Sequence, residues 1–111
     1  MEGVLNVTVA GQHIEIGESL RDTAVDKIKS IEETYNLGVT NVEVTFSRSR
    51  KGFECRIHAH FRNGDINTSG ESDTIYKALN RAATKAIKRA RRIHREKADR
   101  GRETIRVGAY D

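Results

Sequence analysis

Three consecutive segments in the middle of the chain alternate apolar and polar side chains, and this pattern restricts the fold more than any other feature of the sequence. The segments cover residues 42–47, 53–62 and 65–69. Such alternation is typical of strands that bury one face only. Asn63-Gly64 joins the last two segments and is the strongest short hairpin signal. Residues 47–52 predict a longer, basic hairpin loop. The three strands should therefore form one largely antiparallel sheet that is covered on one side.

Two helical patterns and one further strand flank these segments. Residues 5–10 alternate like a strand, and apolar residues recur at helical spacing over about 18–35. A second helix, capped by Ser72 or Asp73, is expected to run to about Ala98. The order β-α-β-β-β-α predicts a two-layer α+β domain with one antiparallel-rich sheet and both helices on one face. This arrangement resembles the double-stranded-RNA-binding fold with an extra opening strand, a likeness that says little about function.

The second helix carries a basic stripe on the side opposite its apolar residues. Between Thr74 and Arg95 the chain has eight basic side chains and no acidic one. At roughly 100° per residue, six of them fall within an arc of about 80°. Like charges stacked on one face destabilise a helix, so the stripe makes physical sense where a polyanion neutralises it. The basic stripe consists of Lys77, Arg81, Lys85, Lys88, Arg92 and Arg95, with Arg89 and Arg91 beside it.

Charge is distributed unevenly along the chain. Residues 1–73 carry 8 Lys/Arg and 12 Asp/Glu, a net of −4, whereas residues 74–111 carry 12 and 4, a net of +8. A surface that serves only solubility intersperses its signs, so this division favours an oriented docking face for nucleic acid. No aromatic platform is interleaved with the stripe, which favours contacts to the phosphate backbone over base stacking. The alternative is a solvated helix face that is merely basic.

Length and composition restrict the class of protein. The 111 residues suit one domain, which we place at 1–100, followed by a short polar tail at 101–111. The single cysteine, Cys55, cannot form an internal disulfide and fits a reducing compartment. The N-terminus lacks a secretory pattern, and no run approaches the roughly 18 apolar residues of a membrane span. We therefore expect a soluble, cytoplasmic protein that does not bind membranes.

The sequence contains no recognisable catalytic constellation. Neither common glycine-rich phosphate loop is present, and Cys55 should be buried and inert. His58 and His60 share one strand face, but zinc needs a third or fourth ligand, and Cys55 points to the opposite face. We therefore expect a solvated sheet face there, with no metal, no cofactor, no small-molecule substrate and no enzymatic activity.

Two stretches of the chain resemble the ribosome hibernation promoting factors, the family that includes the ribosome-associated translation inhibitor. The first is residues 14–21, Ile-Glu-Ile-Gly-Glu-Ser-Leu-Arg, with Lys27 at the family's basic position in mid-helix. The second begins at Ser69-Gly70-Glu71 and ends in the basic cluster 88–92. Thr74 departs from the pattern, because the family usually has an aspartate there. The chain resembles a short member of the family, or the first domain of a long one.

This resemblance implies a monomeric protein that binds the small ribosomal subunit between head and body. There it would overlap the mRNA path and the tRNA sites and silence translation, promoting ribosome hibernation under stress and in stationary phase. By matching position, the residues that would contact 16S rRNA are Lys27, Lys85, Lys88, Arg89 and Arg92. The helix pattern adds Lys77, Arg81, Arg91 and Arg95. The alternatives are a general double-stranded or structured RNA-binding module or RNA chaperone, a protein–protein adaptor, and a metal-dependent nuclease.

Overall fold

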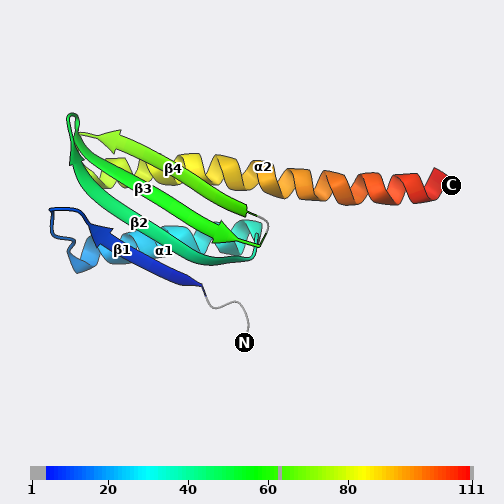
Figure 1. Cartoon of the computed structure of the whole chain (residues 1–111), viewed down its shortest axis with the longest axis horizontal. Coiled ribbons are helices and arrows are strands. Elements are labelled where there is room, and N and C mark those ends of the chain that lie inside the picture. Colours follow the sequence, from blue (N-terminus) through cyan, green and yellow to red (C-terminus); the bar gives the residue numbers. More distant parts are fainter. Residues whose placement is uncertain (1–4, 63, 111) are drawn as a thin grey trace.

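Four strands and two helices make up the fold in the computed structural model, which describes residues 5–62 and 64–110, with side chains described up to Glu96. In chain order they are β1 (Asn6–Gly11), α1 (Glu18–Tyr35), β2 (Val39–Ser49), β3 (Gly52–Phe61), β4 (Gly64–Ser72) and α2 (Ile75–Tyr110). In Figure 1 the sheet forms one layer, and both helices lie behind it. The predicted element order and the two-layer α+β class are confirmed.

The sheet has the strand order β1-β2-β3-β4. β1 pairs with β2 in parallel, because the chain crosses over through α1 between them. β2, β3 and β4 pair antiparallel, as the alternating segments predicted. The register places Glu43 opposite His58 and His60 opposite Asp65. Since side chains alternate between faces, these four residues share the face of the sheet that the helices leave open.

The hydrophobic core lies between the sheet and the two helices. The side chains of α1 and α2 that face the sheet are small or aliphatic, and on α2 most of them are alanines, so this helix can lie close to the strands. The buried apolar residues are Val9, Leu20, Ala24, Ile28, Leu37, Val42, Val44, Phe46, Cys55, Ile57, Ala59, Ile66, Ala78, Leu79, Ala82, Ala83, Ala86 and Ala90.

Two predicted boundaries were wrong. Ser49 pairs with Gly52, so the loop between β2 and β3 contains only Arg50 and Lys51 and not residues 47–52. Gly52 has φ of 130°, a backbone angle that glycine adopts without strain, and this permits the tight turn. α2 continues to Tyr110 and does not stop near residue 98. The chain contains no proline, and the two glycines inside the helix, Gly101 and Gly108, cost only about 1 kcal/mol each.

The start of α2 also differs from the sequence prediction. The helix begins at Ile75, which makes Thr74 its capping residue. The hydroxyl Oγ1 of Thr74 accepts a hydrogen bond from the backbone N–H of Lys77 at 3.3 Å. The predicted cap at Ser72 or Asp73 is therefore wrong, since Thr74 is the residue whose side chain reaches the free N–H group in the first turn. No helix in the described part of the chain is long and apolar enough to span a membrane.

Candidate nucleic-acid interface

Helix α2 packs directly against the edge strand β4, and two residues of β4 set how closely. Thr68 is buried, and its hydroxyl Oγ1 donates a hydrogen bond to the carbonyl oxygen of Ala82 at 3.0 Å. At Gly70, an added Cβ would lie 2.6 Å from the nitrogen of Ala82 and 2.8 Å from the carbonyl oxygen of Ala78. Only glycine therefore lets the helix backbone come this close to the strand.

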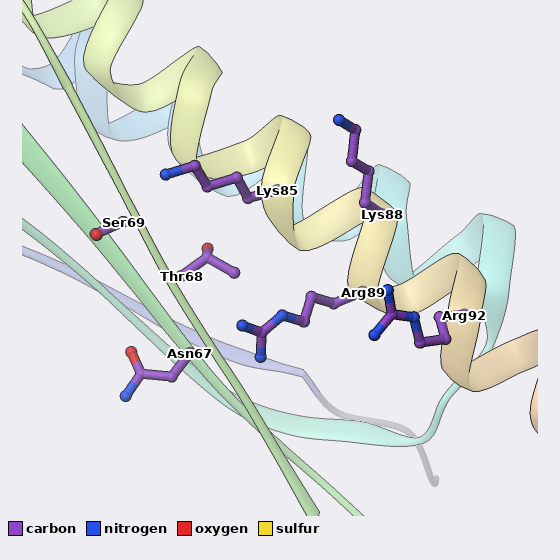
Figure 2. A pocket seen from close by; sticks show the side chains of 7 residues that line it. All are labelled: Asn67, Thr68, Ser69, Lys85, Lys88, Arg89 and Arg92. Carbon is purple, nitrogen blue, oxygen red and sulfur yellow. The ribbon is translucent and has the colours of Figure 1, made fainter.

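A basic groove runs along this seam between β4 and α2. It has a volume of about 380 Å³ and is lined by Asn67, Thr68 and Ser69 of β4 and by Lys85, Lys88, Arg89 and Arg92 of α2. Figure 2 shows Lys85 and Arg89 extending from the helix toward the strand, whereas Lys88 points away from it. No carboxylate lines the groove. Four of the nine residues predicted from the sequence thus meet at one site.

The groove continues toward the start of α2, where its charge becomes mixed. Lys85 and Lys88 also line this second part, together with Arg81 and with Lys51 of the β2–β3 turn. Glu54 and Glu71 lie here as well. Most of the net positive charge is therefore concentrated in the part lined by residues 67–69, Lys85, Lys88, Arg89 and Arg92. The name basic groove refers to this part alone.

The remaining predicted residues lie elsewhere on the surface or are already engaged. Lys77 forms an ion pair with Asp73 at 4.0 Å, and Nη1 of Arg81 donates to the carbonyl oxygen of Glu71 at 3.2 Å. Lys27 is half-buried and lines a separate groove between α1 and α2. Arg91 and Arg95 are exposed but line neither part of the groove along β4. The nine residues therefore do not form one surface.

The four basic side chains of the groove keep their charge accessible. All four residues are exposed, and in the part of the chain with described side chains no carboxylate pairs with them. Cations held on one side of a rigid helix attract a polyanion such as a phosphate backbone. Sequence reasoning missed Asn67 and Ser69, the polar residues on the strand side of the groove. Their alternation placed them on a strand, but it gave no sign that this strand borders the helix.

A second cluster of polar residues lies on the open face of the sheet. The sequence pattern offered no third ligand for His58 and His60, but in the fold Glu43 lies beside them. One possible ligand atom from each of these three residues lies within 4.8 Å of the other two. Glu43 is on β2 and the histidines are on β3, so the cluster depends on the strand register.

Comparison with known proteins gives the family. A family model described as Sigma 54 modulation protein / S30EA ribosomal protein matches residues 7–98. The chain belongs to this family. The match covers β1 from Val7, the other three strands, and both helices up to residue 98, so the basic groove lies inside the family's region. The resemblance predicted from residues 14–21 and from the stretch that ends at 88–92 is confirmed.

Relatives of the chain carry names from the same family. A ribosome hibernation promoting factor of Pseudomonas putida is 26% identical over 93 residues, which cover 84% of this chain and 89% of the relative. A ribosome hibernation promotion factor of Rhizobium meliloti is 28% identical over 96 residues, 86% of this chain but 50% of the relative.

Solved structures share the fold of this family member. A ribosomal subunit interface protein from Coxiella burnetii superposes with a TM-score of 0.73 at 19% identity, over 80% of this chain and 97% of that one. The N-terminal domain of Protein Y from Thermus thermophilus gives 0.71 at 19% identity, over 80% and 99%. At this level of identity the likeness supports the fold alone.

Proposed function

We propose that this chain is a ribosome-binding translation inhibitor that docks on 16S rRNA of the small subunit and promotes ribosome hibernation. Docked there, the compact domain blocks the mRNA path and the tRNA sites by occupying space. It performs no chemistry on its target. Its partner is the ribosome, and the basic groove is the surface that meets the RNA.

The observation that carries this proposal is the composition of the basic groove. Lys85, Lys88, Arg89 and Arg92 line it without a carboxylate, and residues 67–69 of β4 form its other wall. Basic side chains bind the phosphate oxygens of a nucleic-acid backbone. RNA helices are recognised largely through shape, phosphate and 2′-hydroxyl contacts, which suits such a groove.

The family supports a specific partner for this proposed RNA-binding surface. Two relatives of similar identity are named as ribosome hibernation factors, and a protein with the same fold is titled a ribosomal subunit interface protein. These names support the ribosome, and not free structured RNA, as the target of the basic groove. Lys27, Lys77, Arg81, Arg91 and Arg95 are further proposed RNA contacts that lie outside the groove or at its mixed end.

Sedimentation with purified ribosomes tests the proposal. We expect the chain to pellet with 30S and 70S particles at moderate salt and to resist displacement by excess unrelated double-stranded RNA. Changing Lys85 and Arg89 together to Ala should release it, because two phosphate contacts are lost. A control that changes Arg21 and Lys29, two exposed residues of α1, removes the same charge and should stay bound. Displacement by unrelated RNA would instead indicate a general RNA-binding module.

A further inference from the structure

We propose that Glu43, His58 and His60 form a binding site for a divalent transition-metal ion on the open face of the sheet, with Asp65 as the residue that orients both imidazoles. The register explains how the residues meet. Glu43 is the direct cross-strand partner of His58, and Asp65 is the direct partner of His60. Three neighbouring strands thus contribute one carboxylate, two imidazoles and a second carboxylate, in that order across the sheet.

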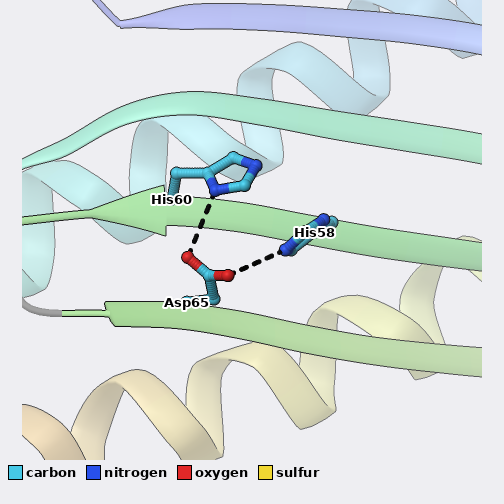
Figure 3. A network of polar contacts seen from close by, with 3 residues as sticks. All are labelled: His58, His60 and Asp65. Carbon is cyan, nitrogen blue, oxygen red and sulfur yellow. Dashed lines mark hydrogen bonds and ion pairs between the residues drawn. The ribbon is translucent and has the colours of Figure 1, made fainter.

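Asp65 bonds to both histidines, as Figure 3 shows. Its Oδ2 lies 3.3 Å from Nε2 of His58, and its Oδ1 lies 3.2 Å from Nδ1 of His60. An ionised carboxylate only accepts hydrogen bonds, so the two contacting nitrogens carry the hydrogens. In the neutral rings, the lone pairs are then on Nδ1 of His58 and Nε2 of His60. A carboxylate that holds the other ring nitrogen is the usual support of a metal-binding histidine.

The third ligand and the charge of the cluster also suit a cation. A ligand atom of Glu43 and one from each histidine lie within 4.8 Å of one another. Zinc bonds of about 2.0–2.2 Å place tetrahedral ligand atoms about 3.3–3.5 Å apart, so the side chains need to close by roughly 1 Å. All three side chains are partly or fully exposed and are free to make this adjustment. Two carboxylates beside neutral imidazoles balance the charge of a divalent ion.

The ligand set selects the class of ion. Imidazole nitrogen with one carboxylate suits Zn²⁺ and neighbouring first-row metals, whereas Mg²⁺ and Ca²⁺ take oxygen ligands. Three protein ligands leave a coordination position for water or for a donor from outside the chain. The site lies on the face of the sheet away from both helices, and none of its four residues lines the basic groove. Asn67, which does line the groove, is the cross-strand neighbour of His58.

Calorimetric titration of the untagged chain with Zn²⁺, in a buffer without chelating groups, tests this site. We expect one ion per chain, and Co²⁺ should give the intense visible absorption of a tetrahedral complex with nitrogen ligands. His58→Ala and Glu43→Gln should each weaken binding at least tenfold. Asp65→Asn should weaken it about 10–100-fold through the lost support of the imidazoles. Circular dichroism of each variant verifies that the fold is retained.

A matched control separates metal binding at this site from metal binding by any exposed histidine. His13→Asn removes an imidazole elsewhere and keeps a residue type that tolerates the φ of 63° at this position. It should leave the Zn²⁺ affinity unchanged. The proposal is overturned if the parent chain binds no Zn²⁺ at millimolar concentration. It is equally overturned if His58→Ala binds as tightly as the parent, or if His13→Asn removes the binding.

Discussion

At the scale of single residues, two uncharged residues of β4, Gly70 and Thr68, set the position of the basic groove. Thr68 fastens β4 to the carbonyl oxygen of Ala82, and Gly70 removes the side chain that would keep α2 away. The distance between strand and helix determines where Lys85 and Arg89 stand relative to residues 67–69. These small residues therefore decide the geometry of a site whose chemistry comes from larger neighbours.

We expect Gly70→Ala to destabilise the protein by about 1–3 kcal/mol, because the new methyl group would overlap the backbone of α2. Urea unfolding measures the loss. Gly17→Ser is the control, since a Cβ at Gly17 meets no heavy atom within 4 Å, and it should change the free energy of unfolding by less than about 0.5 kcal/mol. An unchanged midpoint for Gly70→Ala would mean that α2 does not pack against β4 as described.

Cys55 is confirmed as a buried core residue, and its titration should report on folding. Burial raises the pKa of its thiol from an ordinary 9.0 to about 12, and the nearby charge of Glu54 adds to this. Because the pKa is higher in the folded state, the folded chain holds the neutral thiol more strongly than the unfolded chain does. The contribution of Cys55 to the free energy of unfolding is therefore complete below pH 9 and is lost as the pH rises from 9 toward 12.

For the same reason, a disulfide exchange reagent at pH 8 should react slowly with Cys55 in the native protein and quickly in urea. The absorbance of the released thiol measures both rates, and Cys55→Ser gives the background. Equal rates in the two conditions would show that the thiol is exposed in the folded chain.

At the scale of elements, α2 combines two opposite requirements on one helix. Its alanine-rich face packs on the sheet, while its outer face carries a run of like charges that repel one another. Packing supplies the stability that the charged face removes. The cap at Thr74 and the ion pair between Lys77 and Asp73 add support at the start of the helix. The basic side chains further along α2 are available to bind a partner.

The charged face predicts a salt-dependent affinity for ribosomal RNA. The logarithm of the affinity should fall linearly with the logarithm of the salt concentration. Each phosphate contact should add about 0.7–0.9 to the steepness of the slope. Changing Lys88 and Arg92 together to Ala should therefore flatten the slope by about 1.4–1.8. Filter binding at four or five salt concentrations measures it. The control variant, in which Arg21 and Lys29 are both changed, should keep the parent slope. A similar flattening of the slope in this control would contradict the assignment of the basic groove as the RNA-binding surface.

At the scale of the whole molecule, the two charged regions lie on different sides. The basic groove follows the seam of β4 and α2, whereas the histidine cluster lies on the open face of the sheet at the central strand β3. A compact domain with one basic side can bind RNA in one orientation and fill the space beside it. The proposed mechanism, inhibition by occupancy, needs only such a binding surface.

Inhibition by occupancy predicts a stoichiometric effect on translation. In a titration of in-vitro translation, we expect inhibition to saturate near one chain per ribosome, and excess mRNA with initiator tRNA should relieve it. A gel should show intact ribosomal RNA. Inhibition far below one chain per ribosome, or cleaved RNA, would indicate an enzyme instead.

Local patterns in the sequence predicted most of the fold. Alternation and helical spacing depend only on which side of each element is buried, so the order of strands and helices, the bounds of α1 and the burial of Cys55 could be read directly. The tight turn at residues 50–51, the cap at Thr74 and the end of α2 could not. These depend on single backbone angles and hydrogen bonds that side-chain patterns do not encode.

The sequence by itself determined that one helix is basic on one side and apolar on the other. Only the tertiary structure decided which of those charges act together, because a groove needs a second wall, and β4 supplies it next to Lys85 and Arg89 but not next to Lys27 or Arg91. The same holds for Glu43. It is 15 positions before His58 in the chain, and the strand register alone makes them neighbours, since pairing across a sheet connects residues that no local period relates.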